Sequence, residues 1–292
     1  FGTLWAYIRS ARHLIADKFI ALTGMMTALI FVLQMINFPV AAGTSGHLLG
    51  GALAVIVLGP RLGLICLSVV VIIQSLLFAD GGLSALGINV MNMAIVTSVV
   101  AWVVVKYWIK FIGKNPSSLF IVSILSGTVS VIFSSIAFMM QYILGGTVSI
   151  PIGTVLIAMI SIHFFIGVGE GIITAFIVSL LVRVRPDLVY AYDRDDKNTT
   201  GVSLYGLFIM LILLLSLVTP FASSSPDGLE SVAEEFGFEE TDGIVLLLED
   251  YGINSINNNF ISTVLSALLG IAAIAIITAL VLNRSESGKK TD

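Results

Sequence analysis

Long apolar stretches, almost without charged side chains, make up most of this chain. A bilayer core of about 30 Å needs about 20 such residues in a helix. Hydrophobic residues make up 57% of the sequence and charged residues 11%, whereas soluble proteins are roughly half apolar and a quarter charged. The sequence therefore predicts an all-α integral membrane protein. The predicted spans are 19–38, 47–59 with 61–79 as two legs of a hairpin, 84–105, 118–144, 150–182, 204–222 and 260–282.

One further apolar stretch, residues 1–8, is cut off by Arg9 and is too short to span a bilayer. Because the chain begins with Phe rather than Met, we expect a missing segment of roughly 15 to 20 residues, enough to complete a first helix. Nine helices result when the short leg is counted. The expected architecture is a seven-helix bundle with a truncated first helix, followed by a two-helix unit.

The basic residues predict the orientation, because lysine and arginine mark cytoplasmic loops. When the chain is threaded through the predicted spans, all 14 of its lysines and arginines fall on the same side. We therefore expect a multi-pass protein of the cell (plasma) membrane, with its native N-terminus outside and its C-terminus in the cytoplasm.

The composition divides the chain into a membrane domain, residues 1–185, a polar cytoplasmic linker, 186–203, and a C-terminal two-helix domain, 204–292. The predicted extracytoplasmic loop of the last domain, 222–259, carries half of the chain's 18 acidic residues. Such a loop could concentrate divalent cations by long-range attraction. It could equally be a solvated external segment, since charge runs usually signify solvation. At its start, Pro226-Asp227-Gly228 predicts a turn.

His47 is the first candidate ligand, since it follows a glycine-broken segment at the predicted outer face. An imidazole there, with glycines that allow close backbone approach, suits nickel, cobalt or zinc. A histidine that only hydrogen-bonds a helix end is the alternative. The helix beginning at His47 is short, so the non-helical backbone of 41–46 should lie at membrane depth, where it must line a cavity or pack in protein.

Other polar residues of the spans have two possible roles. Asn89 and Asn92 lie three residues apart on one helix face. They could hydrogen-bond the His47 loop and so hold the imidazole in place, as could Ser45, or they could join helices. His163 and Glu170, seven residues apart, could form a path for metal or protons, or a structural pair. Gln34, Gln74 and Asp80 are candidates to line a cavity wall.

Several motifs, taken in order, resemble the CbiM/NikM substrate-capture family, the S-components of energy-coupling factor transporters for cobalt or nickel. The motifs are Asn37-Phe38-Pro39-Val40, Gly43-Thr44-Ser45-Gly46-His47-Leu48-Leu49-Gly50-Gly51, Leu58-Gly59-Pro60, Gln74-Ser75-Leu76-Leu77-Phe78, Asp80-Gly81-Gly82-Leu83, Asn89-Val90-Met91-Asn92-Met93, and His163 with Gly167-Val168-Gly169-Glu170-Gly171. The resemblance covers roughly residues 1–185. Ser225-Pro226-Asp227-Gly228-Leu229-Glu230 resembles the two-helix CbiN/NikN partner of PDGLE type, here fused to the same chain.

This resemblance implies a square of four nitrogen donors around the metal. Three come from a native Met-His-Ile start, which this chain lacks, and the fourth corresponds to His47. Square-planar nitrogen donors suit nickel and low-spin cobalt better than zinc, and the fusion slightly favours nickel. The metal would be a transported substrate, with no tightly bound cofactor.

The implied partners are a transmembrane coupling subunit (CbiQ/NikQ-like), ATPase subunits of ABC type (CbiO/NikO-like) and membrane lipid, with no nucleic acid. The sequence contains no phosphate-binding loop, no hydrolase motif and only one cysteine, Cys66, so we expect no enzyme. Two alternatives are a proton-coupled secondary divalent-metal transporter that uses His163 and Glu170, and a scaffold or sensor that transports nothing.

Overall fold

The structure is a computed structural model that describes residues 17–40, 44–146, 151–192, 203–236, 248, 251–253 and 255–287. The predictions for the stretch 1–8, for 193–202 of the linker and for most of the acidic loop lie outside these residues. The elements, in chain order, are α2 (Asp17–Gln34), β1 (Phe38–Pro39), β2 (Ser45–Gly46), α3 (Gly51–Leu77), α4 (Leu86–Asn89), the π-helical η2 (Val90–Val96), α5 (Thr97–Ile112), α6 (Pro116–Gly145), α7 (Ile152–Val184), the 3₁₀ turn η3 (Pro186–Leu188), α8 (Leu204–Ser216), a second 3₁₀ turn η4 (Thr219–Phe221), α9 (Gly228–Glu235) and α10 (Asn259–Ser287).

Five helical stretches of the described chain are long and apolar enough to cross a membrane: Gly51–Leu77, Leu86–Ile112, Pro116–Gly145, Ile152–Val184 and Asn259–Thr278. Two shorter apolar helices, Ala21–Gln34 and Tyr205–Phe221, accompany them. The strands comprise only two residues each. These features confirm an all-α, multi-pass membrane protein, whereas the count of nine helices stays a prediction.

Helix α3 is broken where the sequence predicted the tip of a hairpin. Gly59 has φ 80° and ψ 169°, and Pro60 follows it. Proline has no N–H to donate, and glycine accepts the positive φ. A Cβ at Gly63 would lie 3.0 Å from the carbonyl carbon of Ala54, although nine residues of straight helix span about 13 Å. The two legs therefore pack against each other, and the short leg, from Gly51 to Gly59, is buried throughout.

The carbonyl end of the short leg is closed by the chain that follows α7. The N–H of Tyr190 donates to Val57 O at 3.1 Å, and the N–H of Ala191 donates to Ile56 O at 3.0 Å. These bonds satisfy two carbonyls that the helix end leaves without intrahelical partners. The first residues of the predicted linker, up to Tyr192, are thus packed against the bundle.

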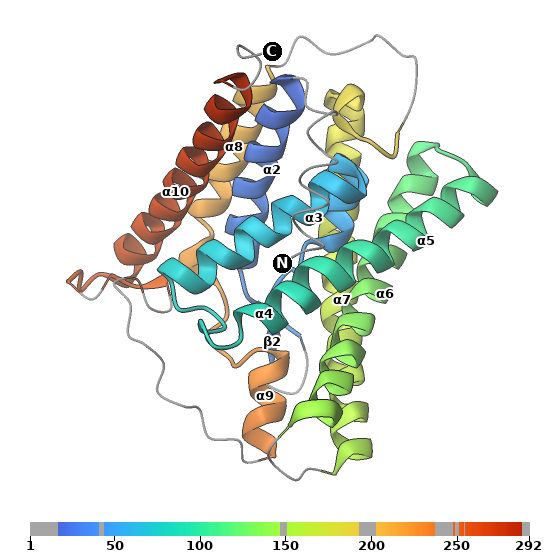
Figure 1. The fold of residues 1–292 in the computed structure, drawn as a ribbon, viewed down its shortest axis with the longest axis vertical. Coiled ribbons are helices and arrows are strands. Elements are labelled where there is room, and N and C mark those ends of the chain that lie inside the picture. The colour runs from blue at the N-terminus through green and yellow to red at the C-terminus, as the bar shows by residue number, and fades with distance from the viewer. Residues whose placement is uncertain are drawn as a thin grey trace.

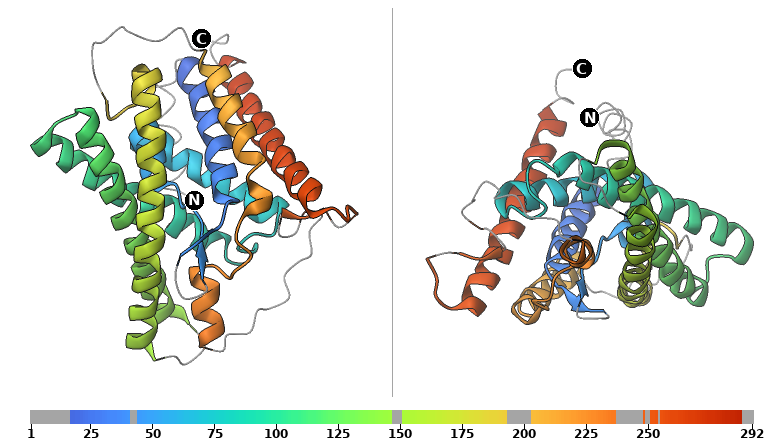
Figure 2. Two further views of the ribbon diagram at one scale, coloured as in Figure 1. Left: turned by 180° about the vertical axis from the view of Figure 1, so that it is seen from behind. Right: turned by 90° about the horizontal axis from the view of Figure 1, so that it is seen from below.

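The C-terminal helices α8 and α10 pack on α2, as Figures 1 and 2 show. Small residues permit the close approach. A Cβ at Gly24 of α2 would lie 2.7 Å from Thr278 Cγ2 of α10, and a Cβ at Gly270 would lie 2.1 Å from Phe31 Cζ. The C-terminal unit is therefore part of the same bundle.

The bundle has two chemically different ends (Figure 1). The end of α5, the end of α7 and the chain terminus C lie in the upper part of the view, whereas β2 and α9 lie in the lower part. The upper end carries Lys106, Lys110, Lys114, Arg183 and Arg185. His47 follows β2, so it belongs to the lower end, away from these cations.

Candidate metal-capture site

Backbone pairing with β1 holds the segment that precedes His47. In this antiparallel pair Phe38 faces Gly46 and Pro39 faces Ser45. A Cβ at Gly46 would lie 2.4 Å from Ile166 Cγ1, so only glycine allows the strand to lie this close to α7. The chain enters α3 through Gly50, which has φ 85°. The predicted non-helical backbone is thus packed in protein at 44–46, while 41–43 lie outside the described residues.

Glu170 of α7 holds the same segment through hydrogen bonds. Its side chain is fully buried, and its carboxylate accepts the N–H of Leu49 at 2.7 Å and that of Gly50 at 3.2 Å. Buried charges need such partners, and a helix N-terminus favours an anion because its first N–H groups have no intrahelical acceptor. Gln34 adds a third tie, since its Nε2 donates to Leu49 O at 2.9 Å.

His163 and Glu170 are not a pair with each other. Seven residues of helix separate them by about 10 Å along the axis, and each has its own partner. His163 Nδ1 lies 2.8 Å from Met159 O. Glu170 is not among the residues that line the pocket described below, whereas His163 is. The two residues thus have separate partners: Glu170 positions the His47 segment, and His163 faces the pocket. A path for metal or protons along them stays a prediction.

The PDGLE turn of the C-terminal unit is bound to the His47 segment. Ser45 Oγ donates to Ser225 O at 2.7 Å, and Ser45 N–H donates to Pro226 O at 2.8 Å. Ser45, expected as a second-shell residue, thus connects two parts of the chain that are 180 residues apart. This contact was not predicted, because a pattern of local residues carries no signal for such a distant partner.

Asp227 is the residue that sequence reasoning missed. Its Oδ1 accepts the N–H groups of Leu229 and Glu230 at 2.7 and 2.9 Å, and Glu230 Oε2 accepts the Asp227 N–H, which completes a capping box. This cap begins α9, and Asp followed by Glu three residues later could have predicted the helix. Asp227 Oδ2 lies 3.8 Å from His47 Nε2, and both side chains are about one quarter exposed.

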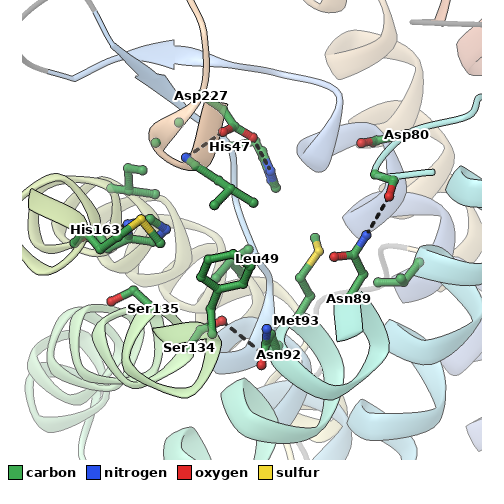
Figure 3. A pocket seen from close by; sticks show the side chains of 18 of the residues that line it. His47, Leu49, Asp80, Asn89, Asn92, Met93, Ser134, Ser135, His163 and Asp227 are labelled. Atoms are coloured by element: carbon green, nitrogen blue, oxygen red, sulfur yellow. Dashed lines mark hydrogen bonds and ion pairs between the residues drawn. The ribbon is translucent and has the colours of Figure 1, made fainter. Parts of the chain in front are cut away.

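A pocket of about 140 Å³ opens beside His47 (Figure 3). His47 and Asp227 lie together on one side, and His163 approaches from α7. Other polar lining residues are Gln74, Asp80, Asn89, Asn92, Ser134 and Ser135. Within the described parts of the chain, no group of three or more His, Cys, Asp and Glu side chains is arranged to hold a metal ion.

Asn89 and Asn92 line this pocket with different hydrogen-bond partners from those expected. Asn89 Nδ2 donates to Gly81 O at 3.3 Å. The amide of Asn92 exchanges two bonds with Gln141 of α6, each of 3.0 Å. Asn92 therefore joins helices around the pocket. The amide groups of Asn89 and Asn92 bond to Gly81 and Gln141 and not to the His47 segment. Both belong to the α4–η2 wall, and π-helical turns such as η2 often occur at functional sites.

Comparison with known proteins places this geometry in a family. Residues 1–188 match the family model of CbiM, the cobalt uptake substrate-specific transmembrane region, and residues 202–284 match the PDGLE domain. The "Putative fused nickel transport protein NikMN" of Archaeoglobus fulgidus is 34% identical over 269 residues, which cover 89% of this chain and 85% of that protein. The cobalt transport protein CbiM of Geobacter sulfurreducens is 29% identical, over 80% of this chain and 71% of that protein.

A solved structure agrees in fold. The crystal structure of a truncated transition metal transporter superimposes with a TM-score of 0.54 and 26% identity, over 62% of this chain and 88% of that one. The family and these relatives are transport proteins rather than enzymes, which confirms the expectation that the chain is no enzyme. The chain belongs to the CbiM/NikM family of nickel and cobalt transport proteins and carries a PDGLE domain behind its CbiM region.

Proposed function

We propose that this chain is the substrate-binding membrane component of an ATP-driven importer of the energy-coupling factor type, and that it captures divalent nickel or cobalt. The observation that carries the proposal is the placement of His47. Its imidazole stands beside a pocket in a membrane-spanning bundle, on a segment tied down by Glu170, Gln34 and Ser45. Such ties hold a ligand before the metal arrives, as preorganised sites require.

His47 would supply one nitrogen donor to the transported ion. Imidazole suits nickel and cobalt, and the remaining nitrogens would come from the native N-terminus, as the family resemblance implies. The ion is cargo in this proposal, with no resident cofactor. Ser45 would support His47 through the backbone, and Asn92 would hold the pocket wall by its bonds to Gln141.

The pocket would open to the outside of the cell. The cations at the ends of α5 and α7 lie at the opposite end of the bundle, and such residues mark the cytoplasmic side. Release would then require the bundle to reorient, driven by a CbiQ/NikQ-like coupling subunit and CbiO/NikO-like ATPases. The partners must hydrolyse ATP, because this sequence has no phosphate-binding loop of its own.

The PDGLE unit would help to load the metal. It places the Asp227 carboxylate beside His47, and a carboxylate at the mouth attracts cations. The rival proton-coupled transporter needs Glu170 on the transport path. Because that carboxylate is occupied by two backbone N–H groups away from the pocket, the structure favours the metal-capture mechanism.

The first test measures nickel and cobalt by elemental mass spectrometry in detergent-purified protein made from its natural translation start. About one metal per chain that disappears in His47→Ala would support the proposal, and the preferred ion would name the substrate. Equal metal in both proteins would contradict it. In reconstituted vesicles, uptake should require active ATPase subunits and survive an uncoupler. Uptake that survives without ATPase activity and collapses with the uncoupler would support the proton-coupled alternative.

A further inference from the structure

We propose that Asp227 and His163, together with His47, form a receiving site that holds the hydrated cation before final capture. The inference rests on the proposed function and adds two residues to the pathway of the ion, one from the PDGLE unit and one from α7. All three side chains line the same pocket. None of the comparisons assigns a role to Asp227 or His163.

His163 is oriented to present a lone pair. A backbone carbonyl can only accept, so the 2.8 Å contact between Met159 O and His163 Nδ1 requires the proton on Nδ1. In the neutral ring Nε2 is then an acceptor, and the neutral imidazole is the form that binds metals. The ring lies against the PDGLE turn, since a Cβ at Gly228 would be 3.3 Å from His163 Cε1. The histidine of α7 and the carboxylate of the fused unit are therefore near neighbours.

The distance between His47 and Asp227 is within the span that one bridging ion can cover. His47 Nδ1 lies 3.1 Å from Leu48 O, so by the same argument Nδ1 carries a proton, and in the neutral ring Nε2 carries the lone pair. With the ring neutral, two acceptors, Nε2 and Asp227 Oδ2, face each other at 3.8 Å, beyond the usual hydrogen-bond range of about 2.7–3.2 Å; with the ring protonated, the same two atoms form an ion pair. An ion bound to each at about 2.1 Å would separate them by up to about 4.2 Å.

Asp227 is held in the orientation that this role needs. The N–H groups of Leu229 and Glu230 both bind Oδ1, which turns Oδ2 toward His47. The pocket, about 140 Å³, exceeds the roughly 10–15 Å³ that one water needs by the same kind of measure. A cation can therefore arrive with much of its water shell, and Asp227 and His163 can replace individual waters.

The receiving site should bind weakly. In the described chain the three groups do not converge tightly enough to hold an ion by themselves. Weak binding is an advantage on a transport path, because an ion must leave each position as readily as it enters. The site would accelerate loading without changing how much metal is bound at saturation.

The test is the initial rate at which detergent-purified full-length protein takes up Ni²⁺ at limiting concentration, with bound metal at saturation measured in parallel. The variants are Asp227→Asn and His163→Asn. Asparagine is as good an N-cap as aspartate, so α9 should still form. At position 163 the asparagine NH₂ group can still donate a hydrogen bond to the Met159 carbonyl. The metal-ligating nitrogen Nε2 is lost. Glu234→Gln, an exposed charge on α9, is the matched control.

We expect Asp227→Asn to load about tenfold more slowly at low salt, because it loses a steering charge. His163→Asn should load more slowly at low and at high salt alike, because it loses a ligand atom and no charge. Both variants should still reach the wild-type metal content. The Glu234→Gln control should load at the wild-type rate. Wild-type rates for Asp227→Asn or His163→Asn would overturn the receiving site, as would equal slowing by Glu234→Gln. If the parent protein binds no metal, or His47→Ala keeps it, the proposed function itself fails, and that result is distinguishable from the others.

Discussion

Replacing Glu170 should destabilise the protein and displace His47, although Glu170 does not line the pocket. In Glu170→Ala the N–H groups of Leu49 and Gly50 lose their acceptor inside the bundle. Each buried, unpaired N–H costs about 1–3 kcal/mol, and the empty volume adds to this. Relief from burying the carboxylate offsets part of the loss. We expect a net loss of about 2–4 kcal/mol in the free energy of unfolding.

Glu170→Gln should be intermediate. Its single amide oxygen can accept one N–H, while its NH₂ group faces the other donor, so about 1–3 kcal/mol should be lost. The control is Thr174→Val, one turn further along α7. The Thr174 hydroxyl is buried and has no hydrogen-bond partner among the described residues, so this change should cost little or stabilise the protein.

The assay is unfolding in mixed micelles by increasing detergent denaturant, followed by circular dichroism, with bound nickel measured on the same samples. Metal affinity should fall in the order wild type, Glu170→Gln, Glu170→Ala. Wild-type stability in Glu170→Ala would refute the assignment of Glu170 as the anchor of the His47 segment. A Glu170→Gln protein that is stable and loaded with metal, yet inactive in uptake, would instead support a role in proton transfer.

Three further substitutions probe the same framework. Gly50→Ala should lower the stability of the protein by about 1–2 kcal/mol, because residue 50 has φ 85°. The control Gly153→Ala, where a Cβ meets nothing within 4 Å, should leave the stability unchanged, and thermal melts compare the two variants. Gln34→Leu should cost about 1–3 kcal/mol by leaving a buried carbonyl without its donor, measured by denaturant unfolding. Tyr251→Phe, which removes the hydroxyl that donates to Asp80, should cost about 1 kcal/mol in the free energy of unfolding, measured in the same way.

The sequence predicted the bundle well because its signals are local. Charge-free length located the long helices, and Gly59-Pro60 predicted the break in α3, since each of these two residues dictates its own backbone conformation. The two-residue strands β1 and β2 escaped prediction because such short pairing leaves no periodic pattern. Pro226-Asp227-Gly228 alone predicts only a turn, whereas the spacing of Asp227 and Glu230 is that of a capping box and marks the start of helix α9.

The site was harder to predict than the bundle. His47 could be singled out as a candidate from its glycine-rich context, but its role stays a prediction. Its neighbour Asp227 is 180 positions away and is placed there by tertiary contacts. The partners of Glu170 are backbone amides, which occur at every residue and therefore leave no trace in a sequence. Helical spacing correctly put Glu170 and His163 on one helix but could not reveal that they serve different neighbours.

The bonds from Ser45 to Ser225 and Pro226 form within one polypeptide, and this changes how readily the two surfaces meet. A separate subunit would have to find this surface by diffusion and match its production to that of its partner. Tethering by a short connection replaces that search with an effective concentration on the order of millimolar. Even a contact with an intrinsic dissociation constant of about 10 μM would then be formed roughly 99% of the time, at any level of expression and in every copy of the protein.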